Sequence, residues 1–154
     1  MGDSAILSNE WEDVEFEVAL DSGSQDHVCD EVDCPGYSTE QSPGSARGQC
    51  FIVGDGNRLP NLGQRPLNLE PMADANVALK SCFQIARVTR PLMSVGKLCD
   101  NGLEVVFNKT QAIVRDSEGV QVCVFERQPG GLYLGKFRLK SPDLSKAPGF
   151  TRQG

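Results

Sequence analysis

The triplet Asp21-Ser22-Gly23 contains the residue types with the clearest chemical potential in this chain. An aspartate that opens a tight turn can present its carboxylate to a cleft. The glycine lets the backbone fold beneath that carboxylate, and the serine hydroxyl can brace the loop. The plainer interpretation is that Asp21 only begins a surface turn, as Asp-Ser-Gly often does. By itself the triplet is a weak indication of a catalytic site.

Peptide hydrolysis by aspartate requires two carboxylates about 3 Å apart that share one proton, because like charges so close cannot both ionise. The ionised carboxylate takes a proton from a water as that water attacks the amide, and the protonated carboxyl donates to the carbonyl oxygen. The chain contains one Asp-Ser/Thr-Gly, because neither Asp3-Ser4 nor Asp116-Ser117 is followed by glycine. A catalytic Asp21 therefore requires a second copy of the chain, and we expect a twofold homodimer.

Alternating apolar residues predict the strand that positions Asp21. Val14, Phe16, Val18 and Leu20 alternate with polar or small residues, and the pattern runs directly into the Asp21 turn. Residues 50–53 predict another short strand. The glycine-rich residues 54–57 after it predict a hairpin, in which we expect positive φ at both residues of the Asp-Gly step. The return arm, residues 58–69, contains Pro60 and Pro66 and predicts an edge strand.

The rest of the chain predicts mostly β structure. Residues 77–88 fit both a strand and a helical face, and we favour the strand. Residues 92–99 predict a strand end passing into a short helix that stops at Asp100-Asn101-Gly102. Four apolar runs, at 103–107, 112–115, 120–125 and 132–139, predict a C-terminal β-meander. The expected class is all-β with one short helix, or at most two.

One domain at residues 13–140 is expected, between tails at 1–12 and 141–154. Within it, residues 25–49 are rich in Ser, Gly, Pro, Asp and Glu and predict a long, mobile surface loop. The chain has a formal net charge of -6, and its 15 Lys and Arg residues are scattered, which argues against a nucleic-acid-binding surface. No apolar run approaches the ~20 residues of a membrane helix, and no signal peptide is evident. We expect an intracellular protein without membrane partners.

Six cysteines and one histidine raise the question of a metal site. No two cysteines form a CxxC pair. A site built from His27, Cys29 and Cys34 is conceivable, but it lacks a second pair of ligands. Free or packed thiols are the favoured interpretation, and no metal is expected.

Three sequence blocks carry a family resemblance. Residues 20–27, LDSGSQDH, resemble the LDSGAxxH signature of the protease segment in Copia-type retrotransposon polyproteins. Residues 53–63, VGDGNRLPNLG, are similar to that family's VGDGxxLPxxG stretch, and residues 91–102, PLMSVGKLCDNG, to its NLLSVxxLCDxG segment. The resemblance continues through the meander and covers about residues 18–139. Where the family has a second glycine after Gly63, this chain has Arg65.

The resemblance implies a retropepsin-like closed β-barrel, the acid-protease fold, in an aspartic endopeptidase that cleaves a Gag-Pol-like polyprotein as a homodimer without metal or cofactor. It would act in the cytoplasm, the nucleus or a virus-like particle. It assigns catalysis to Asp21, the active-site turn to Ser22, Gly23 and Ser24, a second support loop to Val95 and Gly96, and a flap to Gly54, Asp55 and Gly56. Two alternatives stay open: an inactive, domesticated binding or dimerisation domain, and a cellular protease of the ubiquitin-shuttle type.

Overall fold

The computed structural model describes residues 13–73 and 77–142, and nearly all of its regular structure is β. The strands are β1 (Val14–Asp21), β2 (Val28–Cys29), β3 (Cys50–Ile52), β4 (Arg58–Pro60), β5 (Gly63–Pro71), β6 (Leu79–Ile85), β7 (Leu92–Ser94), β8 (Glu104–Phe107), β9 (Gln111–Arg115), β10 (Gln121–Arg127) and β11 (Tyr133–Leu139). The helical segments are η1 (Glu31–Asp33), α2 (Pro43–Ala46) and α3 (Val95–Asp100). The all-β class is confirmed, with three short helical segments in the described residues instead of the expected one or two.

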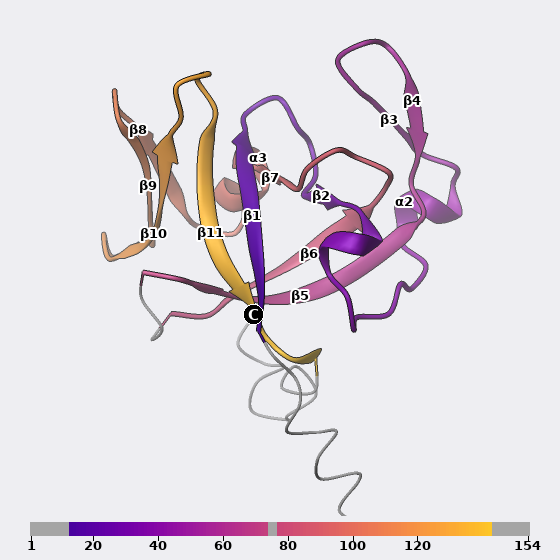
Figure 1. Ribbon diagram of the computed structural model, residues 1–154, viewed down its shortest axis with the longest axis horizontal. Helices are drawn as coiled ribbons and strands as arrows, with labels where there is room; N and C mark the ends of the chain where they lie inside the picture. Colours follow the sequence, from indigo (N-terminus) through magenta and orange to yellow (C-terminus); the bar gives the residue numbers. More distant parts are fainter. Residues whose placement is uncertain (1–12, 74–76, 143–154) are drawn as a thin grey trace, which may run out of the picture.

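Six strands close into a barrel in the order β1-β7-β2-β6-β5-β11, and the antiparallel pair β1–β11 completes the ring (Figure 1). From β11 the sheet continues outward through β10, β9 and β8. These four strands form the predicted meander. The strand favoured for residues 77–88 is confirmed as β6, and the predicted strand-to-helix passage is β7 followed by α3.

Apolar and polar residues alternate in β1 because one face of the strand is buried and the other is exposed. Phe16 and Val18 are buried in the barrel, whereas Glu15 and Glu17 are exposed on its outer face. The ring of Phe16 meets that of Phe83 on β6 edge to face, with centroids 5.4 Å apart. Such pairs add to the stabilisation from area burial alone. The core thus fixes the register of β1, and the register places Asp21 at the end of the barrel.

The prediction of one edge strand over residues 58–69 is wrong. The segment divides into β4, which pairs only with β3, and β5, which lies between β6 and β11. Pro66 is tolerated in β5 because of strand alternation. The N–H groups of Gln64 and Asn68 point away from β6, to the Glu40 carbonyl and the Tyr37 hydroxyl. The missing N–H of Pro66 lies on that same side, so the β5–β6 ladder loses nothing.

The prediction that residues 25–49 form one long surface loop is also wrong. The segment contains β2, η1 and α2, and it buries Val28, Cys29 and Tyr37. The Tyr37 hydroxyl donates to the Lys140 carbonyl at 2.6 Å and ties the segment to the far end of the domain. Its polar composition hid this order, because the contacts that hold it come from residues distant in sequence.

No helix in residues 13–73 and 77–142 is long and apolar enough to cross a membrane. The tails predicted at 1–12 and 141–154 lie outside the described residues, apart from Ser141 and Pro142.

Candidate active site

Asp21 is the last residue of β1, and its carboxylate is held by the turn that follows. The strand register pairs Asp21 with Ser94 at the end of β7. The backbone N–H of Gly23 donates to Asp21 Oδ1 at 2.8 Å, and the N–H of Ser24 donates to the Asp21 carbonyl at 3.4 Å. The half-buried side chain is therefore fixed at one oxygen, while the other carboxylate oxygen accepts no hydrogen bond from residues that the structure describes.

Neither backbone conformation nor space requires glycine at position 23. Gly23 is absent from the glycines with positive φ, and a Cβ at this position would lie 3.4 Å from Asp21 Oδ1. Ser22 is exposed, and its hydroxyl makes no hydrogen bond in the described part of the chain, so the expected bracing of the loop by Ser22 is not seen.

The bracing comes from Ser94, a residue that the sequence did not single out. Ser94 is fully buried, and its hydroxyl donates to the Ser24 carbonyl at 2.7 Å. The same oxygen accepts from the N–H of Lys97 at 3.1 Å and caps α3. Val95 and Gly96, expected to form the support loop, are the first residues of α3, and Ser94 before them makes the contact with the turn. A serine directly before a helix is the signal that could have found it.

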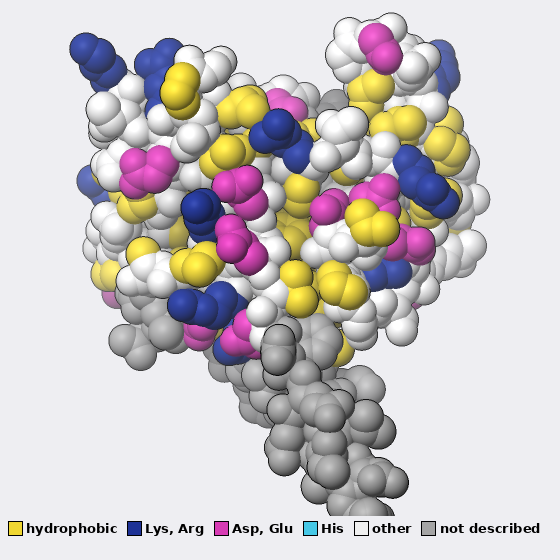
Figure 2. Space-filling model, in the orientation of Figure 1, with side chains coloured by type: hydrophobic (Ala, Val, Ile, Leu, Met, Phe, Trp, Pro, Cys, Tyr) yellow, Lys and Arg dark blue, Asp and Glu magenta, His cyan; other side chains and the backbone are white. Residues whose placement is uncertain are grey.

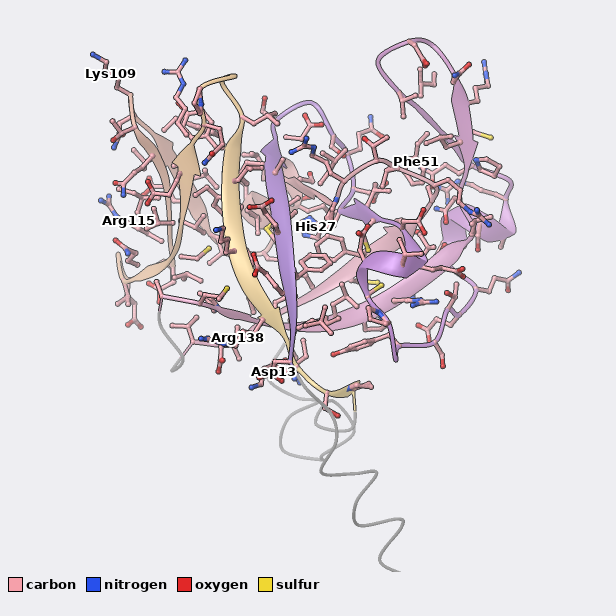
Figure 3. All side chains as sticks on the ribbon, viewed as in Figure 1. Asp13, His27, Phe51, Lys109, Arg115 and Arg138 are labelled. Carbon is pink, nitrogen blue, oxygen red and sulfur yellow. The ribbon has the colours of Figure 1, made fainter. Side chains whose placement is uncertain are left out.

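His27 is the last residue before β2, at the end of a polar segment, and its side chain is buried (Figure 3). Its side chain is 4% exposed and stacks on Phe83, with ring centroids 5.1 Å apart. The backbone N–H of Ser94 donates to His27 Nδ1 at 2.9 Å. Burial, together with the positive charge of Lys97, lowers the pKa of His27 to about 4. His27 is therefore neutral near pH 7 and is a structural support of the site.

The expected flap is a two-stranded hairpin, β3 and β4, that stands away from the barrel (Figure 1). The prediction of positive φ at both turn residues is half wrong. Only Gly56 has it, at φ 87, and no non-glycine residue among those described has positive φ. The Asp55 carboxylate accepts from the N–H of Asn57 at 2.9 Å and closes the turn instead. Gly54 and Gly56 are exposed, and a Cβ at either position would meet no atom within 4 Å, although the Gly56 N–H donates to the Val53 carbonyl at 2.8 Å.

A cavity of about 360 Å³ joins the Asp21 turn to this hairpin. Asp21, Gly23 and Ser24 line one side, and Phe51, Ile52 and Val53 line the other. In the space-filling view the hairpin rises beside a dip in the molecular outline (Figure 2). The described residues supply one other carboxylate to the cavity, that of Asp26, which lies 3.7 Å from the Lys97 ammonium. The arrangement suits an extended chain lying across Asp21.

Cys29 and Cys34 form a packed pair of free thiols, with sulfur atoms 3.8 Å apart. Arg65, which is 8% exposed, donates to the Cys34 carbonyl at 2.8 Å and approaches its sulfur at 3.6 Å. The hydrogen bond from Cys29 and the Arg65 charge lower the pKa of Cys34, while donating that bond and burial raise the pKa of Cys29. Among the described residues, no three His, Cys, Asp or Glu side chains are placed to hold a metal ion.

Comparison with known proteins gave no match to any protein-family model, curated protein or solved structure.

Proposed function

We propose that the chain is an aspartic endopeptidase of the retropepsin kind that works as a homodimer. One observation carries the proposal. The Asp21 carboxylate, fixed by the Gly23 N–H at the end of a barrel strand, lines a cavity covered by a projecting hairpin. A surface turn of the ordinary kind has no need of such a cavity. The resemblance of residues 20–27, 53–63 and 91–102 to the Copia-type protease supports the same function.

In this mechanism each subunit contributes one Asp21. The hydrogen bond at Oδ1 orients the carboxylate and leaves its other oxygen for the shared proton or the attacking water. Asp26 is a poor second carboxylate, because it already forms an ion pair with Lys97, 3.7 Å away. The partner of Asp21 is then the same residue from a second copy, since twofold symmetry brings identical residues together at the axis.

Exposed apolar side chains support a subunit interface at the end of the barrel where β1 finishes. Ile52 is 69% exposed, Phe107 44% and Leu132 42%. Ile52 belongs to the flap hairpin, and the other two lie at the β8–β9 and β10–β11 turns, which reach that end of the molecule (Figure 1). The buried centre of a protein interface is more apolar than the rest of the surface, and phenylalanine is enriched there. A second copy covering this end would bring the two Asp21 turns together.

The hairpin is the proposed lid over the substrate. It pairs with no strand of the barrel sheet, and its turn contains two glycines, which let backbone move and approach a bound peptide closely. Phe51 is half-buried and faces the cavity from this hairpin. We expect the substrate to be an unstructured polypeptide held between the hairpin and the Asp21 turn.

The test compares two aspartate variants in the cleavage of an unstructured polypeptide at mildly acid pH. Asp21→Asn should lower the rate by about a thousandfold or more, the range expected when a general acid or base is lost. Asp116→Asn is the matched control, because Asp116 also opens a turn and its Oδ1 also accepts a backbone N–H two residues later. Equal rates for the wild type and Asp21→Asn would rule out catalysis by Asp21.

Mixing experiments test the dimer separately. When wild type and Asp21→Asn are mixed in equal amounts and allowed to exchange subunits, about a quarter of the dimers should keep two aspartates. The activity should then fall to about a quarter of that of the same total concentration of wild type. If sedimentation shows that the protein is a strict monomer under conditions where it cleaves peptides, the mechanism is contradicted. A stable dimer without cleavage would favour the binding or dimerisation domain instead.

A further inference from the structure

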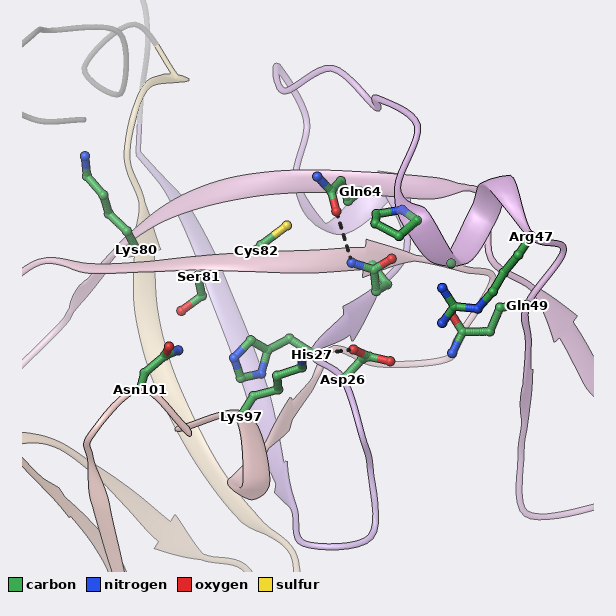
Figure 4. Close-up of a pocket in the computed structure, with 13 residues that line it drawn as sticks. Asp26, His27, Arg47, Gln49, Gln64, Lys80, Ser81, Cys82, Lys97 and Asn101 are labelled. Atoms are coloured by element: carbon green, nitrogen blue, oxygen red, sulfur yellow. Dashed lines mark hydrogen bonds and ion pairs between the residues drawn. The ribbon is translucent and has the colours of Figure 1, made fainter. Parts of the chain in front are cut away.

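A second cavity, of about 440 Å³, lies beside the one at Asp21 and shares Asp26 and Gln49 with it. Its walls come from α3, β6, the turn before β2 and the segment around α2 (Figure 4). Nothing in the proposed catalytic mechanism uses it. Its lining contains no large apolar side chain, so the cavity is unsuited to an apolar ligand.

The cavity is positively charged in a protein whose net charge is -6. Arg47 and Lys97 line it against the carboxylate of Asp26. Lys80 also lines it, but its ammonium points away from His27 and Ser81 (Figure 4), and the Glu40 carboxylate accepts from the lining Gln64 at 3.0 Å. The ion pair between Lys97 and Asp26 is long, at 3.7 Å, and Lys97 is 45% exposed, so its ammonium can also contact a ligand. The guanidinium of Arg47 makes no ion pair with any residue that the structure describes. A cavity of this charge attracts anions.

Two donors in the cavity wall have no hydrogen-bond partner among the described residues. His27 is neutral, and its Nδ1 accepts the Ser94 N–H, so the ring proton lies on Nε2. Within the described chain Nε2 has no hydrogen-bond partner, although the side chain is more than nine-tenths buried. The Ser81 hydroxyl, in a residue that is 8% exposed, likewise has no partner among those residues. Both side chains lie on the side of β6 that faces Asn101 and Lys97 (Figure 4).

We propose that this cavity binds an oxyanion, a carboxylate or phosphate group, held by the Lys97 ammonium, the His27 Nε2–H and the Ser81 hydroxyl. Both donors keep some contact with solvent, because neither is among the fully buried atoms without a partner, so a ligand oxygen can reach and accept from them. Lys97 supplies the charge-assisted bond, and Arg47 adds positive charge to the same cavity. The Asp26 carboxylate stays paired to Lys97, and its negative charge repels an anion bound at its own end of the cavity.

Two sources could supply the oxyanion. Because the two cavities share Asp26 and Gln49, an acidic side chain of a polypeptide lying across Asp21 could enter. A free phosphate-bearing molecule could enter from solvent. The chemistry of recognition is the same, and the experiment separates the sources by using inorganic phosphate and a pair of short peptides that differ only by Glu or Gln.

The experiment uses nuclear magnetic resonance of the untagged chain, in which His27 is the single histidine. Its imidazole signals need no assignment and report directly on Nε2. Saturable shifts of these signals with phosphate or with the Glu peptide, but not with the Gln peptide, are expected. The source that binds more tightly is the one the cavity is built for. The absence of saturable shifts with both phosphate and the Glu peptide would overturn the proposal.

Three variants give the result its specificity. Lys97→Gln and Ser81→Ala should each weaken binding by up to about tenfold, the effect of losing one good hydrogen bond. Lys109→Gln, at the β8–β9 turn far from the cavity (Figure 3), should not change it. Ser81→Ala should not reduce thermal stability, since its hydroxyl has no partner to lose. Equal weakening by Lys109→Gln would mean diffuse attraction and would contradict the site. Repeating the titration on Asp21→Asn keeps this outcome independent of catalysis.

Discussion

Ser94→Ala tests how the barrel holds the Asp21 turn. The Ser94 hydroxyl contacts both α3 and the Asp21 turn, through the Lys97 N–H at 3.1 Å and the Ser24 carbonyl at 2.7 Å. Alanine removes both bonds and leaves the backbone conformation free to persist. The variant should therefore loosen the turn while the barrel stays folded.

The magnitude follows from the two bonds. Loss of a serine N-cap costs ~1 kcal/mol. Loss of the second bond costs about another 1 kcal/mol, and somewhat more because the Ser24 carbonyl is left partly buried without its donor. The free energy of unfolding should fall by about 2 kcal/mol, and for a domain of this size the midpoint of thermal unfolding should fall by roughly 8 °C. Ser94 is fully buried, so solvent cannot replace the lost bonds.

Ser42→Ala is the matched control in urea unfolding and in cleavage assays. Ser42 is also a buried serine N-cap, of α2, and accepts from the Ser45 N–H at 3.1 Å. Both variants should lose stability, but only Ser94→Ala should also lower the cleavage rate under conditions where both remain folded. A loss of less than about 0.5 kcal/mol for Ser94→Ala, the range of ordinary surface substitutions, would refute the reasoning. So would an equal loss of cleavage in the two variants.

Three further predictions concern pH, backbone and thiols. Burial lowers the pKa of His27 from 6.5 to about 4, so the unfolded chain binds a proton that the folded chain excludes. The stability should be fully present above pH 6.5 and fall by roughly 3 kcal/mol towards pH 4, and His27→Gln should flatten that part of the pH profile. Gly63→Ala should cost about 2 kcal/mol in urea unfolding, because Gly63 has φ 136 and a Cβ there collides with the Glu40 carbonyl. Gly119→Ala, with positive φ but open space, should cost less, and an equal cost would contradict the collision. An aromatic disulfide reagent should titrate three thiols in the folded chain and six after denaturation, and more than three rapid thiols would disprove the packing. The rapid ones are the exposed Cys50, Cys82 and Cys99, and the slow ones the buried Cys29, Cys34 and Cys123.

Local patterns predicted those elements whose neighbours in space are also neighbours in sequence. The meander from β8 to β11 and the β3–β4 hairpin are built from adjacent strands and short turns, so alternation and turn residues were sufficient. The same holds for the strand that delivers Asp21. Its turn was predicted from three residues, and the structure adds the Gly23 N–H bond to its carboxylate.

Long-range contacts decided the parts that the sequence misjudged. Residues 25–49 have no apolar period, yet the segment is ordered by bonds such as those from Arg65 to Cys34 and from Tyr37 to Lys140. Pro66 suggested an edge strand, because the sequence cannot tell which side of a strand is paired. Ser94 became important only once β1 and β7 lay side by side.

The sequence by itself determined the all-β class, most of the strands, the projecting hairpin and the position of Asp21 at a strand end, because these follow from alternation and turn chemistry over a few residues. Tertiary structure alone decided that the ring closes through β1 and β11, that Asp21 faces a cavity beneath the hairpin, and that His27 and Ser81 present unpaired donors to a second cavity. The physical reason is that a cavity and its charge are formed by segments that are distant in the sequence. A local pattern of residues does not show which distant segments come together.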